Sequence, residues 1–137
     1  SADKNNIFIR HAGIVTVGNH VTILSNAVVV KSVFRNMPTS IGDHSIIGIS
    51  TTIGHEAQIG KNCRVLGNCV IAKNAQVGDR SIIGSSCVVR ENLVLGRDSD
   101  IKAGSIVVKN VKDEEVVSGN FAINHKQNVK NFFKSMK

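Results

Sequence analysis

Aliphatic residues recur at every sixth position over most of this sequence of 137 residues. The next position is often Gly, and the position four residues after the aliphatic is nearly always small, as Ala57, Cys63 and Ser81 illustrate. A period of six matches neither the turn of an α-helix nor the alternation of a hairpin strand. The aliphatic positions are Val17, Ile23, Val29, Ile41, Ile47, Ile53, Ile59, Val65, Ile71, Val77, Ile83, Val89, Leu95, Ile101 and Val107.

This repeat predicts short parallel strands joined by turns around a triangular prism, an all-β architecture known as the left-handed parallel β-helix. Three hexads form one coil, and successive coils lie about 4.8 Å apart. The aliphatic side chain points into the prism and the small residue fills the corner. Gly is expected to supply backbone freedom at the turn. The crossovers are left-handed, an exception to the general right-handed rule, and we expect a homotrimer.

The composition fits a core built from small aliphatic units. The chain contains five Phe and neither Trp nor Tyr, so large aromatic side chains contribute little to the core. Cys63, Cys69 and Cys87 all occupy the small corner position, and we predict that they are buried, reduced thiols. They form no CxxC pair, which argues against zinc ribbons and thioredoxin-like proteins.

The repeat skips one hexad between Val29 and Ile41, where Arg35 would occupy the aliphatic position. This stretch contains the only Pro of the chain, Pro38, and Pro cannot donate to a strand ladder. We therefore predict a loop inserted near residues 34–40 that protrudes from one corner of the prism. Loops that interrupt a rigid scaffold often carry function.

The loop determines which hexads share a face. With the loop outside the coil, the hexads at 17, 41, 59, 77 and 95 share one face, and those at 29, 53, 71, 89 and 107 share another. In each hexad of this second face, the residue two positions after the aliphatic points outward. These residues then form a column, and the loop protrudes beside it. In the alternative register Arg35 occupies a regular hexad and Met37 lies under His55. The predicted column consists of Lys31, His55, Lys73 and Glu91.

The regular repeat ends near residue 108. We predict that residues 1–112 form the β-helix domain and that residues 113–137 form a crossover and a short amphipathic C-terminal α-helix. Asn124 and Gln127 have the spacing of a capping box. The helix is expected to cover the open last coil, and its lysines suit a second role as a docking surface for an acidic partner. Its apolar residues, at helical spacing, are Val129, Phe132, Phe133 and Met136.

The net charge of +7 favours acidic partners such as nucleotide phosphates, anionic lipid or an acidic carrier protein. Nucleic acid is not expected, because no recognised binding module is present and no aromatic residues alternate with the basic ones. No apolar run approaches the roughly 20 residues of a membrane span and no signal peptide is recognised, so we expect a cytoplasmic protein. The histidines lack the spacing of the gamma-class carbonic anhydrases, which share this fold, and no metal site is predicted.

His55 is the main candidate for chemistry. A neutral His near a cleft can take a proton from an amine or hydroxyl while that atom attacks a thioester. A backbone N–H can hold the oxyanion that forms, and the N–H of Lys73, one coil after His55, is the candidate donor. The alternative for a lone outward His is an ordinary surface residue.

Residues 39–62 resemble the UDP-3-O-acylglucosamine N-acyltransferases of lipid A synthesis. In that family an Ile-small-His-x3-Ile-Gly-x-Asn segment carries the catalytic base, and His55 falls on it. Residues 2–11 and 13–23 follow the family's N-terminal pattern, and residues 117–125 look like its later crossover. The resemblance covers nearly the whole chain, but the family's N-terminal uridine-binding domain has no counterpart here.

The resemblance implies transfer of an acyl group to the amine of a nucleotide-linked amino sugar, with His55 as general base and no bound cofactor. The implied donor is the phosphopantetheine thioester of an acidic acyl carrier protein, and the implied active sites lie between subunits of a homotrimer. The family's oxyanion Gly falls on Lys73. The positions expected to bind substrate are His11, Lys31 and Asn92, of which Asn92 stands where the family has a His.

Two alternatives to this function remain open from the sequence. The first is an enzyme of the same fold that uses acetyl-CoA instead of an acylated carrier protein to acetylate a sugar. The second is a non-catalytic trimeric β-helix scaffold, which would turn over no thioester with any amino sugar. Thioester turnover separates the second from both enzymes, and competition among donors separates the two enzymes from each other.

Overall fold

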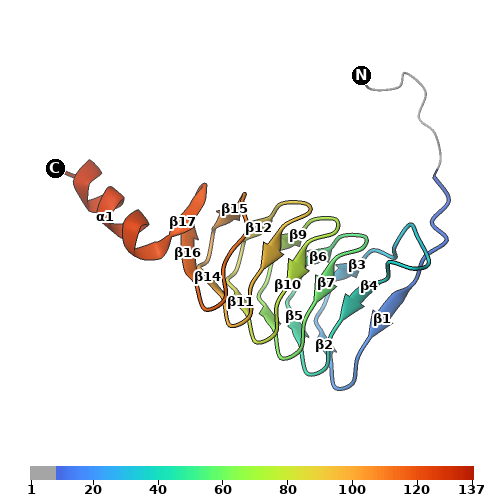
Figure 1. Ribbon diagram of the computed structural model, residues 1–137. Coiled ribbons are helices and arrows are strands. Elements are labelled where there is room, and N and C mark those ends of the chain that lie inside the picture. The colour runs from blue at the N-terminus through green and yellow to red at the C-terminus, as the bar shows by residue number, and fades with distance from the viewer. Residues whose placement is uncertain (1–8) are drawn as a thin grey trace.

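The computed structural model describes residues 9–137, and the N-terminal part of the resemblance at residues 2–8 lies outside them. Short parallel strands stack into a prism with three sheets, which run from β1 at one end to β16 and β17 at the other (Figure 1). Sheet A contains β1 (Val15–Val17), β4 (Thr39–Ile41), β7 (Gln58–Ile59), β10 (Gln76–Val77) and β13 (Val94–Leu95). Sheet B contains β2 (Thr22–Ile23), β5 (Ile46–Ile47), β8 (Arg64–Val65), β11 (Ile82–Ile83), β14 (Asp100–Ile101), β16 (Val116–Gly119) and β17 (Ala122–Asn124). Sheet C contains β3 (Val28–Val29), β6 (Thr52–Ile53), β9 (Val70–Ile71), β12 (Val88–Val89) and β15 (Ile106–Val107).

The strand register confirms the predicted left-handed β-helix. Val17 pairs with Ile41 across the skipped hexad, and Val29 pairs with Ile53. This pairing selects the register with the loop outside the coil and excludes the one with Arg35 in a regular hexad. The aliphatic side chains fill the prism, and from Ile41 to Val107 each is at most 3% exposed. The core is therefore one continuous column of Ile, Val and Leu.

The small corner residues are buried and link successive coils. Ser45 Oγ donates to the carbonyl oxygen of Gly60 (2.7 Å), and Thr51 Oγ1 donates to that of Leu66 (2.8 Å). The three cysteines are free and buried, as predicted, and Cys69 Sγ donates to the Gly84 carbonyl (3.1 Å). A corner residue with a short donor thus satisfies a carbonyl that the strand ladder leaves free.

Gly in the repeat has a different role from the predicted one. Within residues 9–137 the only glycines with positive φ are Gly104 and Gly119, so the repeat glycines do not supply unusual backbone angles. They permit close approach of coils, since a Cβ on Gly48 would lie 2.5 Å from the Leu66 carbonyl carbon. The left-handed residue follows the aliphatic by three positions and is almost always another type. These residues are His20, Asn26, His44, Ser50, Glu56, Asn62, Asn68, Asn74, Arg80, Ser86, Asn92 and Asp98.

The inserted loop lies between β3 and β4, but its predicted end at residue 40 is too late. Thr39 and Ser40 belong to β4, because they pair with Val15 and Thr16 in sheet A. Thr39 is fully buried in the corner position that a regular hexad would give it. The loop therefore returns to the prism at Thr39, beside the corner that carries His55.

The C-terminal region also differs from the prediction. The prism does not end at residue 112, because Val111 bridges Leu95 and β16 pairs with β14 in parallel. Val111 follows Val107 by four residues instead of six, so the corner between them is shortened and the count by sixes is lost. After β16 the chain turns back into β17, which is antiparallel to it.

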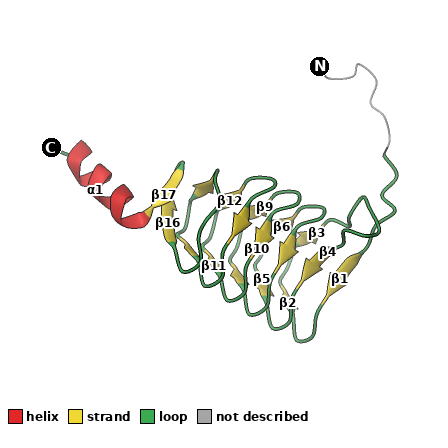
Figure 2. Cartoon of the chain, in the orientation of Figure 1, coloured by secondary structure: helices red, strands yellow, loops and turns green. Residues whose placement is uncertain are grey.

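The C-terminal helix α1 (His125–Ser135) begins at the predicted N-cap, where the Asn124 side chain accepts from the Gln127 N–H. The reciprocal half of a capping box is not formed, since the Gln127 side chain donates to Asn131 instead. The helix does not cover the last coil: none of its residues is buried, and it projects away from the prism (Figures 1 and 2). Within residues 9–137, no helix has the length and apolarity to cross a membrane.

Candidate functional site

Three of the candidate residues share one corner of the prism, between sheets C and A. Lys31, His55 and Lys73 each lie two positions after an aliphatic of sheet C, and the strands β3, β6 and β9 are in register. The backbone continues this register around the corner, where the Asn74 N–H donates to the His55 carbonyl (2.9 Å). The predicted column therefore exists, with His55 between two lysines on neighbouring coils.

The His55 ring is oriented by a carboxylate that was not predicted from the sequence. Its Nδ1 forms a hydrogen bond with Glu56 Oε2. A carboxylate can only accept, so Nδ1 carries the hydrogen and Nε2 of the neutral ring keeps a free lone pair. The His55 side chain is 33% exposed, so this lone pair is within reach of a bound molecule. The only signal in the sequence was the adjacency of a Glu to the candidate base.

Glu56 is buried and its carboxylate is fully engaged. Its Oε1 accepts from the backbone N–H of Val33 in the inserted loop (2.6 Å), while Oε2 meets His55. Burial opposes ionisation, but hydrogen bonds from His55 and from the backbone at Val33 and Phe34 outweigh it and hold the pKa of Glu56 below its ordinary value. Glu56 is therefore ionised at neutral pH and links the loop to the His55 ring.

His11 lies against the same corner. Its ring is edge-on to the His55 ring, with centroids 6.0 Å apart, and its Nδ1–H donates to the Lys31 carbonyl (3.3 Å). The two rings leave their Nε2 atoms as further polar groups of the corner. The structure thus brings together His11, Lys31 and His55 from residues separated by up to 44 positions (from 11 to 55).

The backbone N–H of Lys73 has no acceptor among the described residues. At the corner between sheets A and B the situation differs, because the N–H groups of Lys61 and Arg97 donate to the carboxylates of Asp79 and Asp113. The Lys73 nitrogen lies close to the coil of His55, since a Cβ on Gly54 would lie only 2.8 Å from it. A donor without a partner one coil from His55 can donate to an oxyanion.

Asn92 is not brought next to His55. It follows β12, two coils beyond β6, which places it about 10 Å along the prism axis. Its side-chain oxygen accepts from the Asn74 amide (2.9 Å), so the two residues form a small amide ladder. Asn92 can therefore meet only the distal part of a ligand that contacts His55.

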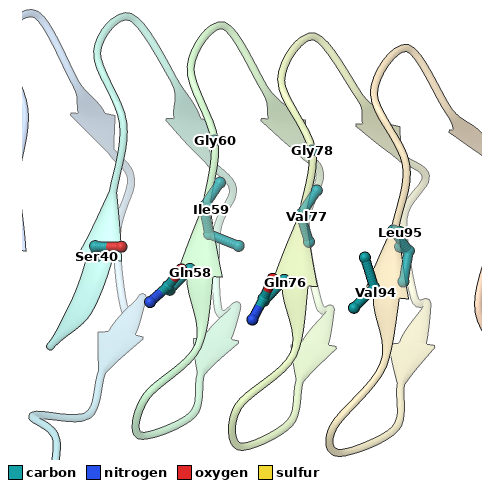
Figure 3. A pocket seen from close by; sticks show the side chains of 9 residues that line it. All are labelled: Ser40, Gln58, Ile59, Gly60, Gln76, Val77, Gly78, Val94 and Leu95. Atoms are coloured by element: carbon teal, nitrogen blue, oxygen red, sulfur yellow. The ribbon is translucent and has the colours of Figure 1, made fainter. Parts of the chain in front are cut away.

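A shallow groove of about 240 Å³ runs along the outer face of sheet A. One of its lining residues, Gln58, follows His55 by three positions in the sequence. Figure 3 shows the Gln58 and Gln76 side chains on neighbouring coils in this groove, with Ser40 before them and Val94 after them. The amides offer donors and acceptors along the prism axis. Within residues 9–137 no group of three potential metal ligands is present.

Comparison with known proteins gives one family match. The sequence profile of the GMPPB C-terminal domain family matches residues 29–136. No functionally curated protein matched the sequence.

Several solved structures share the fold. UDP-N-acetylglucosamine O-acyltransferase (LpxA) from Moraxella catarrhalis superposes with a TM-score of 0.83 at 21% identity, covering 93% of this chain and 51% of its own. The acetyltransferase domain of PglB from Neisseria gonorrhoeae has a TM-score of 0.74 at 21% identity, covering 83% and 54%. A GDP-perosamine N-acetyltransferase from Caulobacter crescentus, in complex with CoA and GDP-perosamine, has a TM-score of 0.52 at 23% identity, covering 83% and 53%. This chain thus spans about half the length of these structures, and the likeness shows the hexapeptide-repeat fold of such transferases.

Proposed function

We propose that this chain, which belongs to the GMPPB C-terminal domain family, is a sugar acyltransferase in which His55 is the general base. The observation that carries the proposal is the His55–Glu56 pair, with the unpaired backbone N–H of Lys73 one coil further along the same corner. A base with an orienting carboxylate and an adjacent oxyanion donor are the parts that acyl transfer needs. The fold of named acyltransferases supports the same reaction class.

The proposed reaction moves an acyl group from a thioester to an amine. His55 Nε2 takes a proton from the acceptor nitrogen as that nitrogen attacks the thioester carbonyl carbon. The carbonyl oxygen becomes an oxyanion and accepts from the Lys73 N–H. The C–S bond then breaks, the thiolate takes the proton from His55, and the amide and a free thiol leave. Glu56 keeps the ring in the tautomer that can perform both transfers.

For the acceptor we propose the amine of a nucleotide-linked amino sugar. Lys31 and Lys73 flank His55 and provide two cationic side chains for phosphate groups. His11 adds a polar group within the same corner, and Asn92 is placed for the distal end of the ligand. The names of the structural neighbours, which include a GDP-perosamine N-acetyltransferase, are consistent with such an acceptor. The narrower proposal is the N-acyl transfer of lipid A synthesis.

For the donor we propose the phosphopantetheine thioester of an acyl carrier protein, with acetyl-CoA as the second candidate. The second candidate is favoured by one neighbour, the perosamine enzyme, whose structure contains CoA. A panel of acyl carrier protein and CoA thioesters of different chain lengths, assayed with one amino-sugar nucleotide, separates the two. A preference for acetyl-CoA would make acetyl-CoA the donor and would contradict the acyl carrier protein as donor.

We further propose that the site is completed in a homotrimer. The outer face of sheet C, which leads into the His55 corner, is apolar and partly exposed, with Val28 at 51% and Val70 at 43%. Packing this face against a second copy would remove apolar surface from water and enclose the corner. Val70→Asp is expected to yield folded monomers with little turnover, as measured by sedimentation and by a thioester assay. A fully active monomeric variant would contradict the shared site.

His55→Ala tests the central proposal. We expect turnover to fall by roughly 10²–10⁴-fold while the fold and the oligomeric state are retained. His44→Asn is the matched control, since His44 lies on another corner with φ of 59°, a conformation that Asn tolerates. Near-normal turnover in His55→Ala would contradict the assignment of His55 as general base. No thioester turnover by the wild-type chain with any amino sugar would favour the non-catalytic scaffold.

A further inference from the structure

The distal half of α1 presents a largely exposed apolar surface. Val129, Phe132 and Phe133 border a hollow whose other side is formed by residues at the end of the prism, Ala103, Ser118 and Gly119. The exposed fraction rises along the helix, from 37% at Val129 to 59% at Phe132, 60% at Phe133 and 66% at Met136. These four residues recur at helical spacing and share one face of α1. An isolated helix of 11 residues gains little stability from its own hydrogen bonds. The stability of the helix itself therefore does not account for four large apolar side chains exposed on one face.

The first turn of α1 is fixed to the end of the prism. The Ser118 hydroxyl in β16 is 7% exposed, is hydrogen-bonded to His125 Nδ1 (2.8 Å) and accepts from Asn128 Nδ2 (2.9 Å). Gly119 makes room for this contact, since a Cβ there would lie 2.6 Å from the Asn128 nitrogen. The helix is therefore held at its base, while its far end extends from the molecule (Figure 1).

The charge of α1 is entirely positive. Residues 125–137 contain four lysines and no acidic residue. Lys126 shares a surface hollow with Glu114 and Glu115, but the other lysines lie farther along the helix. Lys126, Lys130 and Lys134 are spaced by four residues and so form a stripe beside the apolar face. The projecting end of the molecule therefore combines bulky apolar side chains with unneutralised positive charge.

We propose that α1 is a docking helix for an anionic phospholipid surface, on which it lies flat with Phe132, Phe133 and Met136 inserted below the headgroups. Lysines beside a bulky apolar stripe are the pattern of interfacial helices, and the lysine stems reach past that stripe to anionic headgroups. Lipid accommodates Phe and Met side chains without a matched pocket, whereas a protein partner would have to supply one. This role is independent of the reaction at the His55 corner, which lies on the body of the prism.

Vesicle binding by the full chain tests the proposal. Sedimentation with vesicles of phosphatidylcholine alone is compared with equal parts of phosphatidylcholine and phosphatidylglycerol. We expect binding to the anionic vesicles only, and weaker binding as salt is added, because salt screens the lysines. Lys130→Gln with Lys134→Gln should weaken binding about 30-fold, since each Lys near such a surface contributes about a factor of five or six.

Matched variants separate the α1 effect from general charge and apolarity. Phe132→Ser with Phe133→Ser should weaken vesicle binding at least about ten-fold. Phe34→Ser is its control, because Phe34 is 58% exposed on the inserted loop, and Lys61→Gln with Lys112→Gln controls for charge on the prism. Equal loss in the controls and in the α1 variants would overturn the proposal.

Two other occupants would give different results. If α1 instead packs against a second copy, the Phe132→Ser, Phe133→Ser variant will change the oligomeric state in sedimentation velocity, and the wild type will not bind vesicles. If an acidic protein is the partner, a purified acyl carrier protein will bind α1 in the absence of lipid and vesicles will not. Either result would overturn the lipid proposal and leave the assignment of His55 as general base to the His55→Ala experiment.

Discussion

Glu56 occupies a left-handed backbone position, with φ of 58°, and Asn or Ser fills seven of the twelve such positions named above for the repeat. The Glu56 carboxylate forms hydrogen bonds with both the His55 ring and the loop backbone at Val33. Asn tolerates this conformation better than Glu does. The side chain at position 56 is therefore explained by its contacts and not by the turn.

Glu56→Gln should lower kcat by roughly 10²–10⁴-fold, because an amide can donate to Nδ1 and so place the ring hydrogen on Nε2, the wrong tautomer for a base. The measurement is steady-state turnover with saturating donor and acceptor. Glu114→Gln is the control, since Glu114 has the same left-handed conformation, with φ of 61°, at the far end of the prism. Unchanged kcat in Glu56→Gln would remove Glu56 from the mechanism.

The Glu56 contacts also predict how stability changes with pH. Hydrogen bonds outweigh burial and lower the pKa of Glu56 from 4.5, so its ionised form stabilises the folded chain above that value. This contribution should be present at neutral pH and disappear as the pH falls through the lowered pKa. Urea denaturation of the wild type and of Glu56→Gln over a series of pH values measures it. A difference in the free energy of unfolding that persists below the lowered pKa would contradict the assignment.

At the scale of the element, Thr39 is the residue that returns the inserted loop to the prism. Its Oγ1 donates to the Val30 carbonyl (2.7 Å) and accepts from the Glu56 N–H (2.9 Å). One buried hydroxyl thus fixes both the start of the loop and the backbone beside the candidate base. The loop is connected to the site through hydrogen bonds at Val33 and Thr39, 23 and 17 residues from Glu56.

Thr39→Val should lower the free energy of unfolding by about 1–3 kcal/mol, because it leaves two buried backbone groups without partners, and should also lower turnover. Thr51→Val is a matched control: Thr51 Oγ1 makes the same pair of bonds, to the Leu66 carbonyl and from the Cys69 N–H, on a corner without candidate residues. We expect a similar loss of stability in both variants but a loss of turnover in Thr39→Val alone. Equal turnover in the two variants would show that the Thr39 contact with the loop does not affect the reaction.

The elements differ in how well the sequence predicts them. The faces follow from a local rule, one inward aliphatic in six residues. That rule left two registers open across the skipped hexad, and the predicted loop around Pro38 favoured the pairing of Val17 with Ile41 that the structure has. The last coil could not be predicted, because the corner between Val107 and Val111 is two residues short and ends the count. The Glu56 contact with Val33 was also missed, since it depends on the path of the loop and no periodicity encodes that path.

At the scale of the whole molecule, each coil contacts only its neighbours, so stability is distributed along the axis. Aliphatics of the first described coil are poorly covered, with Val17 at 49% and Ile23 at 43% exposed. In the middle of the prism Ile71 and Ile83 are fully buried. The chain therefore has a gradient of packing from β1 towards the central coils.

Amide hydrogen exchange of the isolated chain should reflect this gradient. We expect the amides of β1 and β2 to exchange fastest among the strands and those of β8, β9 and β11 slowest, because opening the first coil exposes little additional apolar surface. Exchange read out by mass spectrometry of peptides from each coil measures it. Uniform protection from β1 to β11 would mean that the prism opens only as a unit.

The contact of repeat glycines with the backbone of the next coil has a consequence for how such a chain can change length. Gly54 faces Lys73 and Gly78 faces Arg97, each one coil ahead, so every coil fits only onto a coil in the same register. A duplication or deletion of three hexads preserves this fit and changes the separation between the His55 corner and α1 in steps of about 4.8 Å. An insertion of one or two hexads within the stack would turn every later side chain onto a different edge. Gene rearrangements that preserve function in this architecture should therefore come in whole coils, or be confined to loops that leave the stack and return to it, as residues 33–38 do.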